Sequence, residues 1–256
     1  MNEYIKTIFS LISGGFLWQG FKFFYPDIKK IVGNKINAKN TLYENLDPIL
    51  KSSSELLGKL ESLAKEDFAT FINKSNSNSI DPLHNKRYVI YLFAQFWAQL
   101  EYLRQESQYY SLAKIKKGRE LLSFIDTIES RKFRILDRSI QRILGESLIT
   151  DKNQKFKIMT LNEFMIEYQK DNSIIALWGN KLEEVLNSVD DKKKRQTILC
   201  FGVIISMLVN HFDPKHKSVR KRVVYKNKLS KSSKEIIKNV LLVEYLTFIK
   251  SKKDYY

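Results

Sequence analysis

Residues 5–25 constrain the fold most strongly, because they are almost entirely apolar and aromatic. Two lysines and one glutamine interrupt them, and Pro26 follows. As a helix these 21 residues would span about 31 Å, close to the roughly 30 Å hydrocarbon core of a bilayer. The pattern therefore predicts an uncleaved N-terminal membrane-anchor helix.

The length of this anchor is marginal. The uninterrupted apolar stretch, Thr7–Phe21, covers only about 22 Å, so Lys6 and Lys22 would have to extend their amines toward the two interfaces. We expect five large apolar side chains to contact lipid: Phe9, Leu11, Leu17, Trp18 and Phe21. No small-residue cleavage site follows, which argues against a cleaved signal peptide. An interfacial helix and a buried helix of a soluble bundle stay open as alternatives.

The lysines around the apolar run predict its orientation. Five lysines lie between residues 22 and 39, whereas only Lys6 precedes the run. Basic residues stay on the cytoplasmic side. We therefore expect a single-pass protein of the cytoplasmic membrane, with its body in the cytoplasm.

Composition predicts that the body is folded and helical. Hydrophobic residues make up 43 % of the chain, which has only 9 glycines and 4 prolines, as expected for long helices rather than disorder. The single cysteine, Cys200, excludes an intramolecular disulfide and fits a reducing compartment.

Helical periodicity covers most of the body, and no alternating strand pattern of useful length is present. The expected helices lie at residues 49–63, 86–109, 112–131, 139–149, 160–169, 173–187, 197–209 and 236–249. The fold class is therefore all-α, a multi-helix bundle after the anchor. The 13 nearly unbroken apolar residues from 197 to 209 are too few for a second span, so we expect a buried central helix.

Local signals place several helix ends. Thr160 with Glu163, and Ser232 with Glu235, have the spacing of capping boxes, and Ser173 is a further N-cap candidate. Pro48 fits either the first turn of a helix or a kink within a longer one.

The net charge of +16 is distributed unevenly along the chain. We divide it into an anchor (1–26), a helical body (27–214), a basic connector (215–238) and a C-terminal helix (239–256). The connector has ten basic residues and one acidic residue, +9, and residues 1–39 have six and two, +4. The last eighteen residues add +1, which leaves +2 for residues 40–214.

The connector is the second functional signal. We expect seven of its basic side chains to contact anionic lipid or phosphate: Lys215, Lys217, Arg220, Lys221, Arg222, Lys226 and Lys228. Anionic headgroups attract such clusters by roughly 1 kcal/mol per residue, and nucleic acid would bind them through counterion release. A solvated, partly disordered linker is the third alternative.

The sequence otherwise has few candidates for catalytic or metal-binding residues, and we assign no catalytic residue, metal ligand or cofactor. His211, Asp213 and His216 crowd one segment, but their spacing matches no zinc motif. Cys200 lies in an apolar stretch, which favours a structural thiol. Glu101 and Arg104 have i,i+3 spacing and are expected to form a structural ion pair or to contact another helix.

Three stretches are similar to a widespread group of uncharacterised bacterial proteins. The first is residues 91–97 with Glu101, Leu103, Arg104 and Glu106; the second is Phe133, Arg134 and Ile135 with Gln141, Arg142, Gly145 and Glu146; the third is Leu42, Tyr43 and Leu46. The resemblance implies a short N-terminal membrane segment followed by a helical body, and it implies no activity.

These observations predict a non-enzymatic, membrane-tethered helical scaffold or regulator. Its expected partners are membrane lipids and either another protein or a second copy of this chain. The alternative is a soluble helical effector that binds nucleic acid through residues 215–238.

Overall fold

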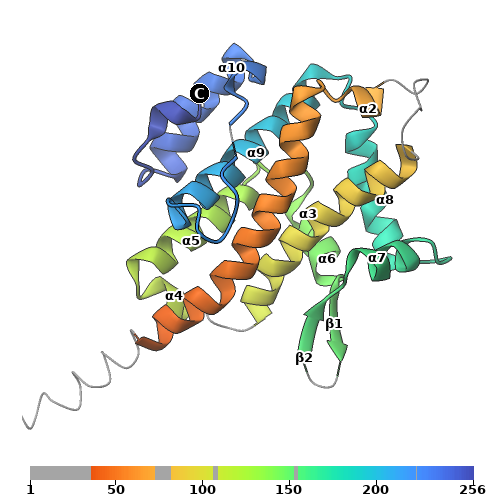
Figure 1. The fold of residues 1–256 in the computed structure, drawn as a ribbon, viewed down its shortest axis with the longest axis horizontal. Coiled ribbons are helices and arrows are strands. Elements are labelled where there is room, and N and C mark those ends of the chain that lie inside the picture. Colours follow the sequence, from red (N-terminus) through yellow and green to blue (C-terminus); the bar gives the residue numbers. More distant parts are fainter. Residues whose placement is uncertain (1–35, 73–81, 106–108, 153–154, 223) are drawn as a thin grey trace, which may run out of the picture.

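The computed structural model describes residues 36–72, 82–105, 109–152, 155–222 and 224–256 (Figure 1). The expected anchor lies outside these residues. Residues 36–65 are helical. The other elements are α2 (Ala69–Ile72), α3 (Pro82–Gln105), α4 (Tyr109–Ala113), α5 (Lys116–Glu129), α6 (Arg138–Glu146), β1 (Ile149–Lys152), β2 (Lys155–Ile158), α7 (Leu161–Tyr168), α8 (Ile174–Leu186), α9 (Lys192–Phe212), the 3₁₀ turns η1 (Lys226–Lys228) and η3 (Lys252–Asp254), α10 (Lys231–Ile236) and the π-helix η2 (Ile237–Tyr245).

The predicted multi-helix body is confirmed, and one continuous hydrophobic core extends from the helix over residues 36–65 to Tyr255. Its centre is aromatic: Phe201 of α9 packs against Phe93 and Phe96 of α3, with ring centroids 5.5 and 6.3 Å apart. The α9 stretch 198–209 is buried throughout, as expected for a central helix. Hydrophobic burial at this scale is the main stabilising contribution to such a body.

Helix α6 packs closely on α3 because Gly145 has no side chain. A Cβ atom at Gly145 would lie 2.7 Å from the carbonyl carbon of Trp97, closer than atoms approach in real structures. Gln141, 1 % exposed, accepts hydrogen bonds from the backbone N–H groups of Ile135 (3.1 Å) and Leu136 (3.2 Å), which fixes the entry to α6. Residues 91–97 of α3 and Gln141, Arg142 and Gly145 of α6 therefore belong to two helices that pack directly on each other.

The sequence signals for helix ends are confirmed at two places and wrong at a third. Thr160 and Glu163 form the expected capping box of α7, and Ser173 caps α8. The predicted box at Ser232 is wrong, because α10 begins earlier, at Lys231, and Ser230 accepts the hydrogen bond of the cap. Pro48 lies within a longer helix, since residues 36–65 are helical on both sides of it.

Two further expectations are corrected. The body contains one antiparallel hairpin, in which Ile149 of β1 pairs with Ile158 of β2, and it projects on the side away from α10 (Figure 1). The single helix expected over residues 112–131 is divided into α4 and α5. At this break the carbonyl oxygen of Leu112 lies 2.1 Å from the place that a Cβ atom of Gly118 would occupy, so the close approach requires a glycine.

Candidate functional site

The basic connector (residues 215–238), or basic segment, follows α9 through a turn organised by Asp213. This side chain is 7 % exposed and accepts hydrogen bonds from the backbone N–H groups of Lys217 (2.9 Å), Ser218 (2.9 Å) and Val219 (3.1 Å). Burial alone would raise the pKa of Asp213, but these three bonds hold it below its usual value. The carboxylate thus fixes the backbone that carries the first lysines of the segment.

Two glycines on different helices receive the middle of the segment. The guanidinium of Arg222 lies over Gly58, where a Cβ atom would be 2.5 Å from one of its nitrogens, and it faces Glu61 at 3.9 Å. The ring of Tyr225 enters α9 at Gly202, where a Cβ atom would be 1.8 Å from its hydroxyl. Tyr225 is 6 % exposed, and burial raises the pKa of its phenol. The middle of the segment is therefore packed into the body.

Two of the remaining lysines also hold the segment in place. Lys228 forms an ion pair with Asp67 at 2.8 Å, and Lys226 donates to the backbone oxygen of Lys253 at 3.0 Å. The fold thus divides the seven predicted contact residues into one group with partners in the body and one group that is exposed. Arg222, Lys226 and Lys228 have structural partners within the body.

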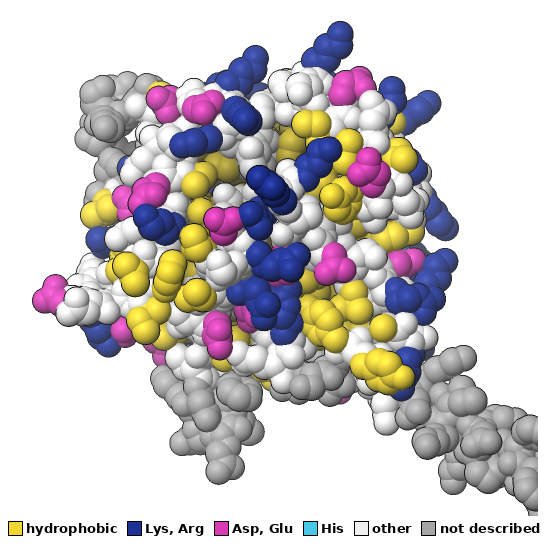
Figure 2. All heavy atoms as spheres, turned by 180° about the vertical axis from the view of Figure 1, so that it is seen from behind, with side chains coloured by type: hydrophobic (Ala, Val, Ile, Leu, Met, Phe, Trp, Pro, Cys, Tyr) yellow, Lys and Arg dark blue, Asp and Glu magenta, His cyan; other side chains and the backbone are white. Residues whose placement is uncertain are grey.

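The other four predicted contact residues face solvent. Lys215, Lys217, Arg220 and Lys221 are exposed, and none of them forms an ion pair with an acidic residue in the described ranges. Figure 2 shows that Lys and Arg on the back face lie close to Asp and Glu side chains and hydrophobic patches. We call these four residues the basic loop; later in the segment, Lys231 and Lys238 are exposed as well.

The predicted anchor residues, Phe9, Leu11, Leu17, Trp18 and Phe21, lie outside the described residues. Among the residues that the structure describes, α9 alone has the length and apolar composition of a membrane span. However, 67 % of its apolar window is buried inside the body. Helix α9 is thus a core helix, as expected for residues 197–209.

His211, in the last turn of α9, belongs to a hydrogen-bond cluster. Nε2 of His211 lies 2.8 Å from a carboxylate oxygen of Glu120 and 3.0 Å from the amine of Lys117. Burial lowers the pKa of His211, against the opposing effect of Glu120. No group of three or more His, Cys, Asp or Glu side chains suited to a metal occurs in the described ranges.

Cys200 has the environment of a structural thiol. It is 8 % exposed, and burial raises the pKa of the thiol to about 11. Nucleophilic cysteines need the opposite shift, because the thiolate is the reactive form.

Glu101 and Arg104 form the expected ion pair and also join other helices. Arg104 bonds to Glu101 and to Glu129 of α5, and Arg142 of α6 approaches Glu101 at 3.3 Å. Burial raises the pKa of Glu101, while the two arginines oppose that shift. Three helices therefore share one partly buried charge network, in which each carboxylate has a cationic partner.

Comparison of the chain with protein-family models, with curated proteins and with solved structures found no match. The resemblance to the bacterial group therefore has no support from these comparisons.

Proposed function

We propose that the protein is a non-enzymatic, membrane-tethered helical scaffold or regulator whose basic loop contacts anionic lipid headgroups. The observation that carries the proposal is the basic loop itself, with four exposed cations and no acidic partner in the described ranges. Residues 5–25 would supply the tether. The body would lie on the cytoplasmic side, where it would bind another protein or a second copy of this chain.

The fixed backbone supports this use of the loop. Asp213 holds the start of the loop, and Arg222 and Tyr225 hold the residues that follow it. A loop that is already ordered loses less conformational entropy when its side chains meet a surface. Because each basic residue near an anionic membrane contributes roughly 1 kcal/mol, four would contribute about 4 kcal/mol.

That energy alone gives weak binding, and the membrane anchor would compensate for it. A contact worth about 4 kcal/mol corresponds to a dissociation constant of roughly 1 mM. A membrane anchor raises the effective concentration of lipid at the loop, so that such a weak contact persists. The loop would then set the orientation of the body on the membrane rather than its affinity.

Two experiments test the proposal. Carbonate washing of membranes should leave the full chain in the pellet; release into the supernatant would contradict the tether. The body without residues 1–26 should bind phosphatidylcholine vesicles only when phosphatidylglycerol is included, and added salt should weaken that binding.

A charge-matched pair of variants isolates the loop. Replacing Lys215, Lys217, Arg220 and Lys221 with Gln should abolish vesicle binding. The control replaces four exposed basic residues elsewhere, Lys51, Lys116, Arg131 and Lys238, so that both variants lose four positive charges. Equal losses in both variants would show that only net charge matters and would overturn the assignment of the loop.

Nucleic acid is the second candidate, favoured only by the same four cations. Base stacking needs exposed aromatic rings, and the ring of Tyr225 is buried. If the body ignores anionic vesicles at low salt and retains RNA or DNA through the four loop residues, this second function replaces the first.

A further inference from the structure

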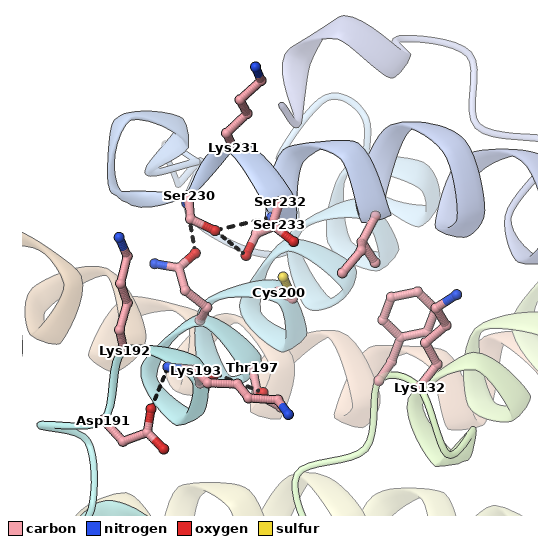
Figure 3. Close-up of a pocket in the computed structure, with 13 residues that line it drawn as sticks. Lys132, Asp191, Lys192, Lys193, Thr197, Cys200, Ser230, Lys231, Ser232 and Ser233 are labelled. Atoms are coloured by element: carbon pink, nitrogen blue, oxygen red, sulfur yellow. Dashed lines mark hydrogen bonds between the residues drawn. The ribbon is translucent and has the colours of Figure 1, made fainter.

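A cavity of about 790 Å³ opens where three separate parts of the body meet (Figure 3). One wall is the first two turns of α9, the second is the beginning of α10, and the third is the loop after α5. Gln196 ties the first two walls together, because its amide accepts from the backbone N–H of Ser230 (2.8 Å) and donates to the carbonyl of Lys228 (2.9 Å). The volume is within the usual range for small-molecule sites.

The rim of the cavity is positively charged. Lys132 comes from the loop after α5, Lys192 and Lys193 from the first turn of α9, and Lys231 from the first turn of α10. Figure 3 shows these side chains arriving from different elements. All four lysines are exposed, and in the described ranges none forms an ion pair.

One acidic residue, Asp191, also lines the cavity. Its carboxylate accepts a hydrogen bond from the backbone N–H of Lys193 at 2.7 Å and caps α9. Four lysines against one aspartate leave the lining with a charge of +3. Such a rim is suited to a multiply charged anion.

The remaining lining is largely apolar or already hydrogen-bonded. Phe133 (2 % exposed), Cys200 (8 % exposed) and the partly buried Ile236 line the cavity. The hydroxyl oxygens of Ser230 and Ser233 bond to each other at 3.0 Å. A ligand therefore finds apolar surface beyond the charged rim.

We propose that this cavity binds a small organic phosphate with an apolar body. The phosphate would lie at the part of the rim formed by Lys132 and Lys193, because Figure 3 shows the amines of Lys192 and Lys231 directed away from the cavity. The apolar part would cover Phe133, Cys200 and Ile236. The inference is independent of the membrane contact, because the four lysines are distinct from those of the basic loop.

The test uses 1-naphthyl phosphate as the probe, with the full chain kept in a neutral detergent. Isothermal titration should show one site per chain. Inorganic phosphate, which lacks the apolar body, and 1-naphthol, which lacks the charge, should each bind at least about tenfold more weakly, because each loses one of the two contributions. Equal binding of either one would overturn the proposal.

Paired variants locate the site. The double variant Lys132→Gln/Lys193→Gln should weaken binding at least about tenfold, since charge-assisted hydrogen bonds are lost. Lys51→Gln/Lys238→Gln changes two exposed lysines outside the cavity and should leave the affinity unchanged. An unchanged affinity in the first variant, or equal losses in both, would show that the probe binds elsewhere.

A second readout does not depend on charge. In amide NMR spectra, saturating 1-naphthyl phosphate should shift the signals of Lys193, Ser232 and Ser233. Shifts confined to other parts of the chain would overturn the assignment, even if the probe binds.

Discussion

Replacement of Tyr225 by alanine tests whether the basic segment is part of the folded body. The ring is 6 % exposed and lies against Gly202 of α9, close to Leu60 of the helix over residues 36–65. Removing a buried aromatic ring usually costs about 3–5 kcal/mol, because transfer energy is lost and a cavity remains. For a chain of this size that corresponds to a fall in melting temperature of roughly 6–20 °C.

The phenolic hydroxyl should contribute much less than the ring. Its hydrogen bond to the carbonyl of Leu199 is 3.5 Å long, at the limit of such bonds. Tyr225→Phe should therefore cost no more than about 1 kcal/mol. Tyr110→Ala is the matched control, because Tyr110 is 77 % exposed and should change stability by less than about 0.5 kcal/mol.

Denaturant unfolding followed by circular dichroism measures all three variants. Trypsin gives an independent readout, since release of the ring should expose Lys226 and Lys228 to cleavage in Tyr225→Ala alone. The reasoning fails if Tyr225→Ala is as stable as Tyr110→Ala, because the segment would then be a solvated linker rather than a docked one.

Four further predictions follow from the fold. Trp97→Ala, at a site 2 % exposed, should destabilise the body by roughly 3–5 kcal/mol in denaturant unfolding; a neutral effect would show that Trp97 is not part of the core. Gly145→Ala should destabilise it by about 1–3 kcal/mol, because the new methyl group meets the backbone of α3; an unchanged midpoint would contradict the close packing. The lowered pKa of His211 means that the unfolded chain binds this proton more readily, so the free energy of unfolding should fall as pH falls below about 6.5. The variant His211→Gln should flatten that dependence between about pH 7 and 5, above the range where Glu120, with its lowered pKa, takes up a proton. A reporter that is active only outside the cytoplasm, fused after Tyr256, should be silent, and an active fusion would reverse the expected orientation.

The helical class was predictable because helix period, caps and scarce glycine agree along the body. The Thr160 box illustrates this, since its two residues act locally and need no tertiary partner. The capping box predicted at Ser232 was wrong because Ser230, two residues earlier, caps the helix instead. The break before α5 and the hairpin were missed for different reasons. The break brings Leu112 close to Gly118, a contact that helical periodicity does not reveal. The hairpin has strands of only four residues.

The site was predictable only in part. Sequence identified the basic segment, but it could not separate the four exposed residues from Arg222, Lys226 and Lys228, whose partners are at least 27 positions away in the chain. The cavity was missed because its lysines come from residues 132, 192–193 and 231. A local signal did exist: the run Asp190–Arg195 places two acids before four bases, at the beginning of a long helix.

The two glycines that receive the basic segment differ in how far they constrain sequence divergence. In relatives of this chain, position 202 should be larger than glycine only where position 225 is smaller than tyrosine, because a Cβ atom and the phenol occupy the same space. Position 58 is less constrained, because the atoms that approach it are the far end of the flexible Arg222 side chain. Positions 202 and 225 should therefore co-vary across a separation of 23 residues, and an alignment that contains such exchanges would identify the segment as docked without any further structure.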